Sequence, residues 1–225
     1  MAEATNQNPQ GAIESTVVDW SSDQTVFKGV PWGKAMMWIF LLSDTFIFTC
    51  FLVSYMTIRM TTGAPWPEPS LVFGLTVFGM NVPLLLIAIM TFILITSSGT
   101  MALAVNMGYR GNKNGVFWLM LATALLGLSF VGMQAFEWSK LISEGIYAWE
   151  NQMEAAPQFG SIFFMVTGFH GLHVSAGVAY LAIIAFRVRM GKYDKKGYDI
   201  VEITGLYWHF VDLVWVFIFA FFYLW

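Results

Sequence analysis

The sequence predicts an all-α, polytopic membrane protein, a bundle of five transmembrane helices. Two features of its composition point to this fold class: hydrophobic residues make up 57% of the 225 residues, and charged residues only 11%. The charged share is roughly half of what a soluble domain carries, so too little polar surface is available to cover a water-soluble globule. The third observation is that the apolar residues gather in five runs of about 20 residues or more, the length that crosses a hydrocarbon core.

The five runs are joined by short polar segments. Because no water reaches the backbone in lipid, each run must satisfy its own hydrogen bonds and is predicted as a helix. The predicted spans cover residues 35–58, 74–105, 116–136, 159–186 and 203–225, with Asn81 and Pro83 interrupting the start of the second. Residues 1–34 contain no apolar core of a signal peptide. The chain therefore divides into a polar, cytoplasmic N-terminal segment (1–34) and one transmembrane domain (35–225).

The joints between the spans contain turn residues and much of the charge. Residues 65–69, Pro-Trp-Pro-Glu-Pro, predict a stiff first loop, and residues 109–115, rich in Gly and Asn, predict a tight turn. Residues 139–157 form an acidic loop that holds Glu144, Glu150 and Glu154. Residues 187–202 form a basic loop.

The basic residues predict the orientation, because loops rich in Lys and Arg stay in the cytoplasm. In a five-span protein the N-terminal segment and the second and fourth loops share one side. Most of the basic residues lie there: Lys28, Lys34, Arg110, Lys113, Arg187, Arg189, Lys192, Lys195 and Lys196. The first and third loops hold only Arg59 and Lys140. The N-terminus is therefore predicted inside and the C-terminus outside.

Charge and cysteine content exclude several classes of protein. A net charge of −3 with 11 Lys and Arg residues does not supply the basic face of a nucleic-acid binder. The single cysteine, Cys50, excludes intrachain disulfides and any metal site built from several cysteines.

Few ionisable residues lie inside the predicted spans, where such residues usually face protein or water. Asp44 and Asp212 each lie nine residues from the inner end of their span. At the rise of an α-helix both are about 14 Å deep, so they are predicted at the same level near the midplane. His209 precedes Asp212 by three residues and shares its helix face. His170 and His173 form a similar stripe on the fourth span.

The histidines have two interpretations. Either they bond polar groups across helix interfaces, or they ligate a metal or haem, since imidazole is a common ligand. A haem held by two histidines needs both at nearly equal depth on facing helices. Counted from the inner edge, His209 lies about 9 Å deep, His173 about 20 Å and His170 about 24 Å. We therefore expect no haem and no metal in this chain.

The carboxylates also have two interpretations. Asp44 and Asp212 can be structural, or they can be stops on a proton path. No ladder of further Asp, Glu or His residues continues from them to either surface, which disfavours a self-contained pump. Glu137, close to Gln134 and Trp138, ends the third span and is interpreted as an interfacial anchor.

Three segments carry a resemblance to a known family. They are Phe-His-Gly-Leu-His-Val at 169–174, followed by Arg187 near the helix end; Tyr-Trp-His-Phe-Val-Asp at 207–212, preceded by Glu202; and Gln-Ala-Phe-Glu-Trp at 134–138. Together they resemble the motifs of cytochrome c oxidase subunit III, the subunit III family of the haem–copper respiratory oxidases. The resemblance runs from about residue 32 to the C-terminus.

The resemblance implies a complex that reduces oxygen to water and pumps protons across a bacterial inner (plasma) membrane. Subunit III of this family contains no metal, so haem and copper are expected in partner subunits. It lies beside subunit I, with subunit II and a small subunit IV as further partners, holds phospholipid, and supports proton uptake and lasting turnover. The resemblance leaves open whether this complex also joins a respiratory supercomplex. The enzyme is then the cytochrome c oxidase complex, with no catalytic centre in this chain.

The resemblance also assigns roles to particular residues. Asp44 is assigned to the support of proton uptake. Structural or lipid-contacting positions are Gln134, Glu137, His170, His173, Arg187, Glu202, His209 and Asp212. The chain departs from the family in two ways. It lacks the two additional N-terminal helices of seven-helix members, so another subunit would have to close the lipid cleft. Ser43-Asp44 also stands where the family has Ser-Glu, its carbodiimide-reactive carboxylate, and the shorter side chain draws the acid back by about 1.5 Å.

Other functions are compatible with the same sequence. The nearest are subunit III of a quinol oxidase and an accessory protein of a nitric-oxide reductase. From another class, a small proton-coupled transporter would use Asp44 and Asp212, and a flux assay in liposomes would distinguish it from a helper subunit. A b-type cytochrome is excluded by the unequal depths of the histidines.

Overall fold

The structure is a computed structural model, and it describes residues 30–63, 65–77, 80–149, 156, 158–193 and 197–225. Most of the predicted N-terminal segment, residues 1–29, lies outside the described residues. So do Glu150 and Glu154 of the predicted acidic loop, and Lys195 and Lys196 of the basic loop.

Five helices among the described residues are long and apolar enough to cross a membrane, as predicted. They are α2 (Trp32–Thr61), α4 (Leu85–Tyr109), α5 (Lys113–Ser143), α6 (Gln158–Arg189) and α7 (Asp199–Phe219). The last helix continues into one π-helical turn, η1 (Ala220–Leu224). Long uninterrupted helices follow from the apolar runs, because only intrahelical hydrogen bonds satisfy a backbone in lipid.

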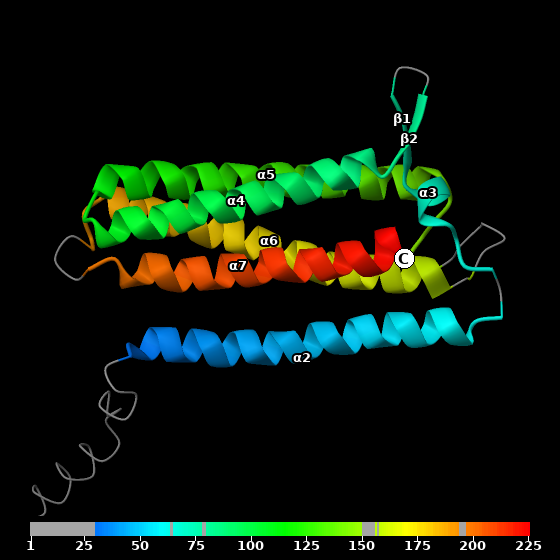
Figure 1. Cartoon of the computed structure of the whole chain (residues 1–225), viewed down its shortest axis with the longest axis horizontal. Helices are drawn as coiled ribbons and strands as arrows, with labels where there is room; N and C mark the ends of the chain where they lie inside the picture. The colour runs from blue at the N-terminus through cyan, green and yellow to red at the C-terminus, as the bar shows by residue number, and fades with distance from the viewer. Residues whose placement is uncertain (1–29, 64, 78–79, 150–155, 157, 194–196) are drawn as a thin grey trace, which may run out of the picture.

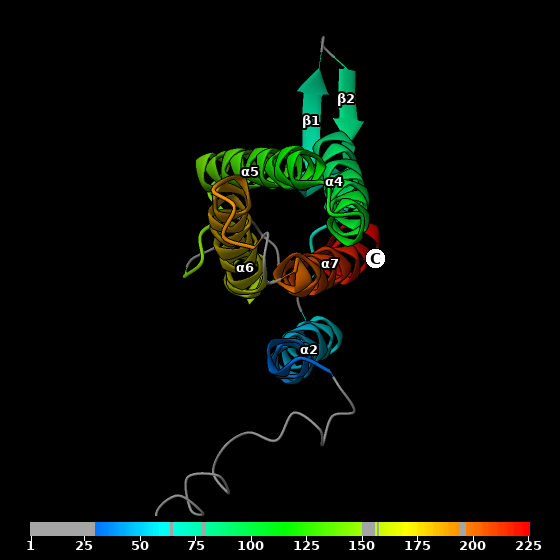
Figure 2. The ribbon, with the colours of Figure 1, turned by 90° about the vertical axis from the view of Figure 1, so that its left-hand side faces the viewer.

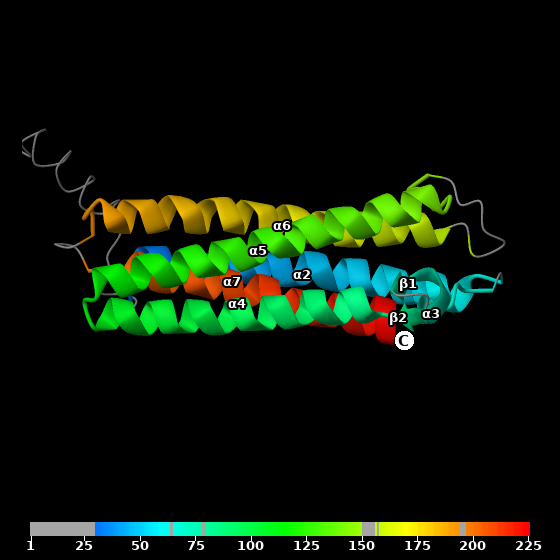
Figure 3. The same cartoon turned by 90° about the horizontal axis from the view of Figure 1, so that it is seen from above.

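Helices α4 to α7 form a ring, and α2 lies outside it (Figures 1 and 2). Going round the ring, α4 contacts α5, α5 contacts α6, α6 contacts α7, and α7 closes the ring on α4. Helix α2 packs against α7 and, less extensively, α6. The view from above shows all five helices running along one common direction (Figure 3). One helix is thus attached to the bundle along a single side.

The connections lie at the two ends of the bundle in alternation, as five spans require. The start of α2, the turn between α4 and α5, and the connection from α6 to α7 lie at one end, here called the turn end (Figure 1). The other end, here called the hairpin end, holds the short helix α3 (Pro69–Val72), a two-stranded hairpin and the C-terminus. The predicted cytoplasmic joints therefore share the turn end.

The helices extend beyond the predicted spans. Helix α2 begins at Trp32, inside the segment predicted as polar, and α5 continues to Ser143, seven residues past the predicted end at 136. Apolar runs mark only the part of a helix that lies in hydrocarbon. Beyond it, continuing the helix is the simplest way to pair backbone groups, so the turn between α4 and α5 shrinks to residues 110–112.

The prediction that the second span begins at residue 74 is wrong. Residues 74–83 do not join the helix but form an antiparallel hairpin, β1 (Gly74–Val77) and β2 (Met80–Pro83), with Gly74 opposite Pro83. Pro83 has no N–H to donate, and Leu84 adopts a left-handed backbone with φ of 60°. Because that conformation is incompatible with a right-handed helix, α4 begins only at Leu85.

Close packing of α7 against α5 and α6 depends on Gly127. A Cβ at this position would overlap the buried ring of Trp208 and come within 2.7 Å of Cγ2 of Val178. By contrast, a Cβ at Gly132, on the same helix, would meet nothing within 4 Å. The two glycines therefore form a matched pair, one inside the bundle and one on its surface.

Replacing Gly127 by Ala is expected to destabilise the bundle by about 1–3 kcal/mol, because overpacking forces a rigid indole to move. The Gly132→Ala control is expected to be neutral or slightly stabilising, because alanine favours the helix over glycine. Thermal unfolding of both purified variants in detergent measures the difference. Equal midpoints for the two variants would contradict the proposed packing.

Candidate functional site

Polar contacts join the otherwise apolar α2 to the rest of the protein, and the first lies at the turn end. Lys34 of α2 forms an ion pair with Glu202 in the first turn of α7. Both side chains are partly exposed, so the pair contributes little free energy on its own. The pair instead fixes the register of the two helices, because it holds the turn-end part of α2 against α7.

The second contact is a carboxylate–imidazole pair in the middle of the helices. Oδ2 of Asp44 lies 3.2 Å from Nε2 of His173 on α6. Asp44 is buried at 4% exposure, and among the described residues its Oδ2 forms no hydrogen bond of standard geometry, so the contact with His173 is a close approach of two polar atoms. Nδ1 of His173 lies 2.9 Å from the carbonyl oxygen of Phe169, which requires a proton on Nδ1. The two side chains thus bring a carboxylate and an imidazole together across the α2–α6 interface.

The third contact lies at the hairpin end. Nη1 of Arg59 donates to the hydroxyl of Tyr55, 3.0 Å away, and Cζ lies 5.3 Å from the ring centroid of Trp225. The stacked guanidinium links the end of α2 to the end of η1 through a cation–π contact.

Inside the ring, two polar side chains of α7 gather around α4. Nδ1 of His209 lies 2.5 Å from the hydroxyl of Ser98, and that hydroxyl also bonds the carboxylate of Asp212. The shared helix face predicted for His209 and Asp212 is therefore present. At the adjacent positions of both helices, Nε1 of Trp208 donates to the hydroxyl of Ser97 over 2.9 Å. These contacts tie α7 to α4.

A second buried polar cluster lies towards the hairpin end. Glu137 is 3% exposed, and its Oε2 accepts hydrogen bonds from the amide of Gln134 at 3.0 Å and from the hydroxyl of Tyr223 at 3.2 Å. The carboxylate points into the protein, so the prediction of an interfacial anchor is wrong for this side chain. The reason is that α5 continues past the predicted span end, which places Glu137 inside the packed bundle.

His170 differs from His173 although the two were predicted on one stripe. It is completely buried, and neither ring nitrogen has a hydrogen-bond partner among the described residues. Its ring stacks on Trp215 at 5.4 Å and meets Phe130 edge-on at 5.9 Å. The surroundings are aromatic, which gives His170 a packing role.

The remaining predicted site residue, Arg187, is exposed near the turn end of α6. The structure thus separates the predicted residues into an α2–α6 pair, two clusters inside the ring, and individual positions. In the part of the chain that the structure describes, no three His, Cys, Asp or Glu side chains lie close enough to hold a metal ion.

Sequence reasoning missed Ser98, Tyr223 and Lys34, which complete these clusters. A signal existed for Ser98, since Ser97-Ser98 is a polar pair within an apolar run. Tyr223 lies in an aromatic stretch that gives no sign of a hydrogen bond to a residue 86 positions away. Nothing local marks Lys34 as the partner of Glu202.

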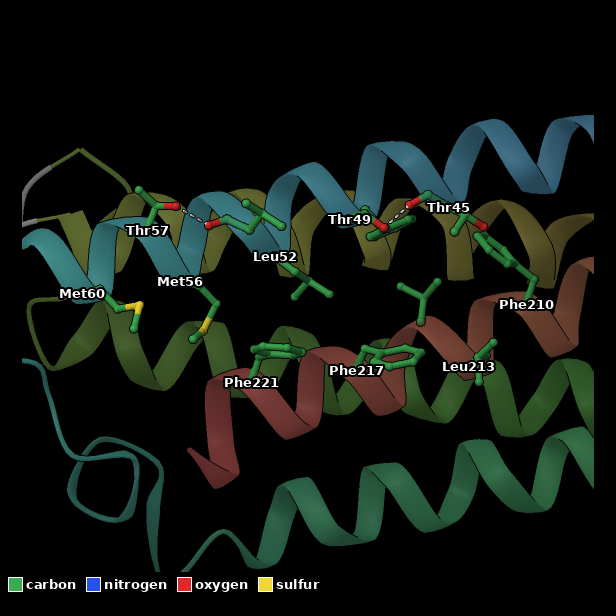
Figure 4. A pocket seen from close by; sticks show the side chains of 13 residues that line it. Thr45, Thr49, Leu52, Met56, Thr57, Met60, Phe210, Leu213, Phe217 and Phe221 are labelled. Carbon is green, nitrogen blue, oxygen red and sulfur yellow. Dashed lines mark hydrogen bonds between the residues drawn. The ribbon is translucent and has the colours of Figure 1, made fainter.

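A groove runs along the surface between α2 and α7 (Figure 4). Its volume is about 470 Å³, and its walls are Thr, Leu, Val and Met side chains of α2 facing Phe, Leu and Val side chains of α7 and η1. A second hollow of about 310 Å³ continues towards the turn end and shares Thr45, Phe210 and Leu213 with the first. An extended apolar ligand fits such a shape.

Comparisons with known proteins agree with the motifs. A family profile described as cytochrome c oxidase subunit III matches residues 11–225. The cytochrome c oxidase subunit 3 of Rattus norvegicus is 35% identical over 208 residues, which cover 89% of this chain and 71% of that protein. A probable quinol oxidase subunit 3 of Staphylococcus haemolyticus is 32% identical over 191 residues, 84% of this chain and 86% of that protein. A probable cytochrome c oxidase subunit 3 of Mycobacterium tuberculosis is 32% identical over 182 residues, with 81% and 82% coverage.

Proposed function

This chain belongs to the cytochrome c oxidase subunit III family, and from that membership we propose that it supports the oxygen-reducing subunit of a haem–copper oxidase without a catalytic centre of its own. As a subunit III it is part of an oxidase complex, and partner subunits are therefore expected. The proposal adds that subunit I is the direct neighbour, that subunits II and IV complete the complex, and that haem and copper reside in those partners.

The observation that carries the proposal is the buried pair of Asp44 and His173. Oδ2 of Asp44, on the helix that is attached to the bundle along a single side, lies 3.2 Å from Nε2 of His173 on α6. A carboxylate beside an imidazole in a low-dielectric site interacts more strongly with nearby charges than the same groups do in water. We assign Asp44 to the support of proton uptake by the neighbouring subunit, with His173 as its positioning partner.

The proposed location is a bacterial plasma membrane with the turn end on the cytoplasmic side. The basic residues that favour this orientation include Lys34, Arg110 and Arg187, all at or near the turn end of their helices. Two of the bacterial relatives named above support a bacterial source, although the family also includes the rat protein.

Affinity purification of the tagged chain from its native membrane tests the proposal. We expect a complex that contains haem, absorbs in the Soret region and reduces oxygen, and an isolated chain with no Soret band. A Soret band in the isolated chain, or proton-coupled solute flux through it in liposomes, would contradict a supporting role. The liposome arm also tests the transporter alternative.

A second candidate is subunit III of a quinol oxidase, which the name of the Staphylococcus haemolyticus relative favours. The same purified complex distinguishes the two. Oxidation of reduced cytochrome c indicates a cytochrome c oxidase, whereas oxidation of a quinol without cytochrome c indicates a quinol oxidase. Recovery with a nitric-oxide reductase would indicate the remaining alternative.

A further inference from the structure

The carboxyl group of Glu137 is hydrogen-bonded on one side only. Its Oε2 accepts hydrogen bonds from Gln134 and Tyr223, whereas its Oε1 is buried and has no hydrogen-bond partner among the described residues. Within that part of the chain, Glu137 also forms no direct ion pair with a Lys or Arg side chain. A buried carboxylate normally has partners for both of its oxygens, because it has lost its water shell. Oε1 of Glu137 therefore indicates a bound partner other than a side chain of the bundle.

A small cavity lies beside Glu137, where α3, the start of α4 and the end of α5 meet. It leaves about 10 Å³ for the centre of a water molecule, and its walls are Glu137, Lys140 and five apolar side chains, those of Val72, Phe73, Leu86, Ile87 and Leu141. On this measure one water molecule requires roughly 10–15 Å³. Cavities lined by hydrocarbon alone stay dry, but this one has an acid and an amine in its wall. Its size admits a single water molecule and no larger ligand.

Lys140 has a hydrogen-bond donor available for such a water molecule. It lies one turn after Glu137 on α5, and its side chain is 25% exposed. The ammonium group donates to the carbonyl oxygen of Gly74 and lies 3.4 Å from Oε1 of Glu144. Because an ammonium group has three donors, one of them remains for the cavity.

We propose that this cavity binds one water molecule, which accepts a hydrogen bond from Nζ of Lys140 and donates one to Oε1 of Glu137. Lys140 is then the counter-ion of the buried carboxylate, separated from it by one water molecule. Such a bridge is nearly as favourable as a direct hydrogen bond and offsets part of the cost of burying the charge. It also joins the buried cluster of Gln134, Glu137 and Tyr223 to the surface at the hairpin end. The inference goes beyond the proposed function and does not depend on it.

Other occupants fit the cavity less well. A metal cation would lie beside the ammonium group of Lys140, and an anion would lie beside the carboxylate of Glu137, so each would meet a like charge. A direct ion pair between the two side chains would require Lys140 to give up its contacts with Gly74 and Glu144. A water molecule keeps all of these contacts, since it both accepts and donates hydrogen bonds.

Electron cryo-microscopy of the purified oxidase complex tests the site, at a resolution that shows buried water molecules elsewhere in the complex. We expect one peak about 2.5–3.2 Å from both Nζ of Lys140 and Oε1 of Glu137. Lys140→Met removes one of the two hydrogen bonds and is expected to lose the peak. The matched control is Glu144→Gln, which leaves Lys140 and the cavity wall unchanged and is expected to keep it.

A second pair of variants leaves both charged residues in place. Val72 is buried and lines the cavity. Val72→Ile adds one carbon to this wall and is expected to displace the water molecule, whereas Val72→Ala enlarges the cavity and is expected to keep it. Hydroxyl-radical labelling by X-ray radiolysis, which marks side chains beside bound water, gives a second readout. Labelling of Phe73 should fall severalfold in Val72→Ile and persist in Val72→Ala.

Three results would overturn the site. The first is a map of the unmodified complex without the peak, and the second is a peak that persists in both Lys140→Met and Val72→Ile. The third is a peak with oxygen neighbours at about 2.0–2.6 Å, which indicate a bound metal ion. None of these readouts depends on haem content or oxygen reduction, so failure of the site and failure of the proposed function are distinguishable.

Discussion

Replacing Asp44 by Leu is expected to loosen α2 from the bundle and to shorten the working lifetime of the oxidase severalfold. The substitution leaves the His173 imidazole facing an apolar side chain at the centre of the helices. Removing one member of a buried ion pair costs about 3–5 kcal/mol, because the remaining group stays buried without its partner. The Lys34–Glu202 and Arg59–Trp225 contacts at the two ends of α2 remain, together with the apolar packing of Phe48 and Tyr55.

The lifetime is measured as the decay of oxygen consumption during continuous turnover, together with the amount of this chain that remains in the complex. Asp44→Asn keeps the shape but not the charge, and is expected to shorten the lifetime while leaving assembly intact. Asp44→Glu restores the acid and is expected to act like the original residue. If Asp44→Asn has an unchanged lifetime, the carboxylate does not support proton uptake.

A double-substitution cycle with His173→Gln distinguishes the pair from two independent structural residues. If the contact between the two side chains links them, the effects of Asp44→Asn and His173→Gln on lifetime are not additive. Additive effects would place the two residues in separate roles. The pH dependence of the turnover lifetime is a further readout, which a merely structural contact would leave unchanged.

The five helices could be predicted because hydrophobic length is a property of single segments. The Asp44–His173 pair could not. Depth counted from the predicted span ends put Asp44 about 14 Å and His173 about 20 Å from the inner edge, so the two were not matched. The helices instead begin and end beyond the predicted spans, α2 at Trp32 and α6 at Arg189. Span ends are therefore poor reference points for pairing residues across helices.

Local spacing predicted contacts within a helix and failed for contacts between helices. The i and i+3 relation correctly placed His209 and Asp212 on one face, but Ser98, to which both are joined, comes from a different helix. The hairpin shows that local spacing also failed within one segment. Pro83 was recognised as an interruption of the helix, but the strand that ends at Pro83 was not predicted. Interhelical partners depend on rotation and register, which no single segment encodes.

A loss of stability of similar size is expected at Glu137. Glu137→Leu removes the shared acceptor of Gln134 and Tyr223, both of which are buried donors. Each buried polar group left without a partner costs about 1–3 kcal/mol, so the substitution is expected to destabilise the chain by about 2–5 kcal/mol. Thermal unfolding of the purified complex in detergent, followed by release of this subunit, measures the loss.

Two controls locate the effect in the cluster. Glu144→Leu removes an exposed acid whose side chain pairs with Lys140 at 3.4 Å, and should change the unfolding midpoint little. Tyr223→Phe removes one donor and leaves the carboxylate bonded to Gln134, so its effect should fall between those of the two glutamate variants. If Glu137→Leu unfolds at the same temperature as Glu144→Leu, the cluster does not hold η1 against α5. In that case the aromatic contacts of Tyr223 with Phe73 and Trp215 must hold it.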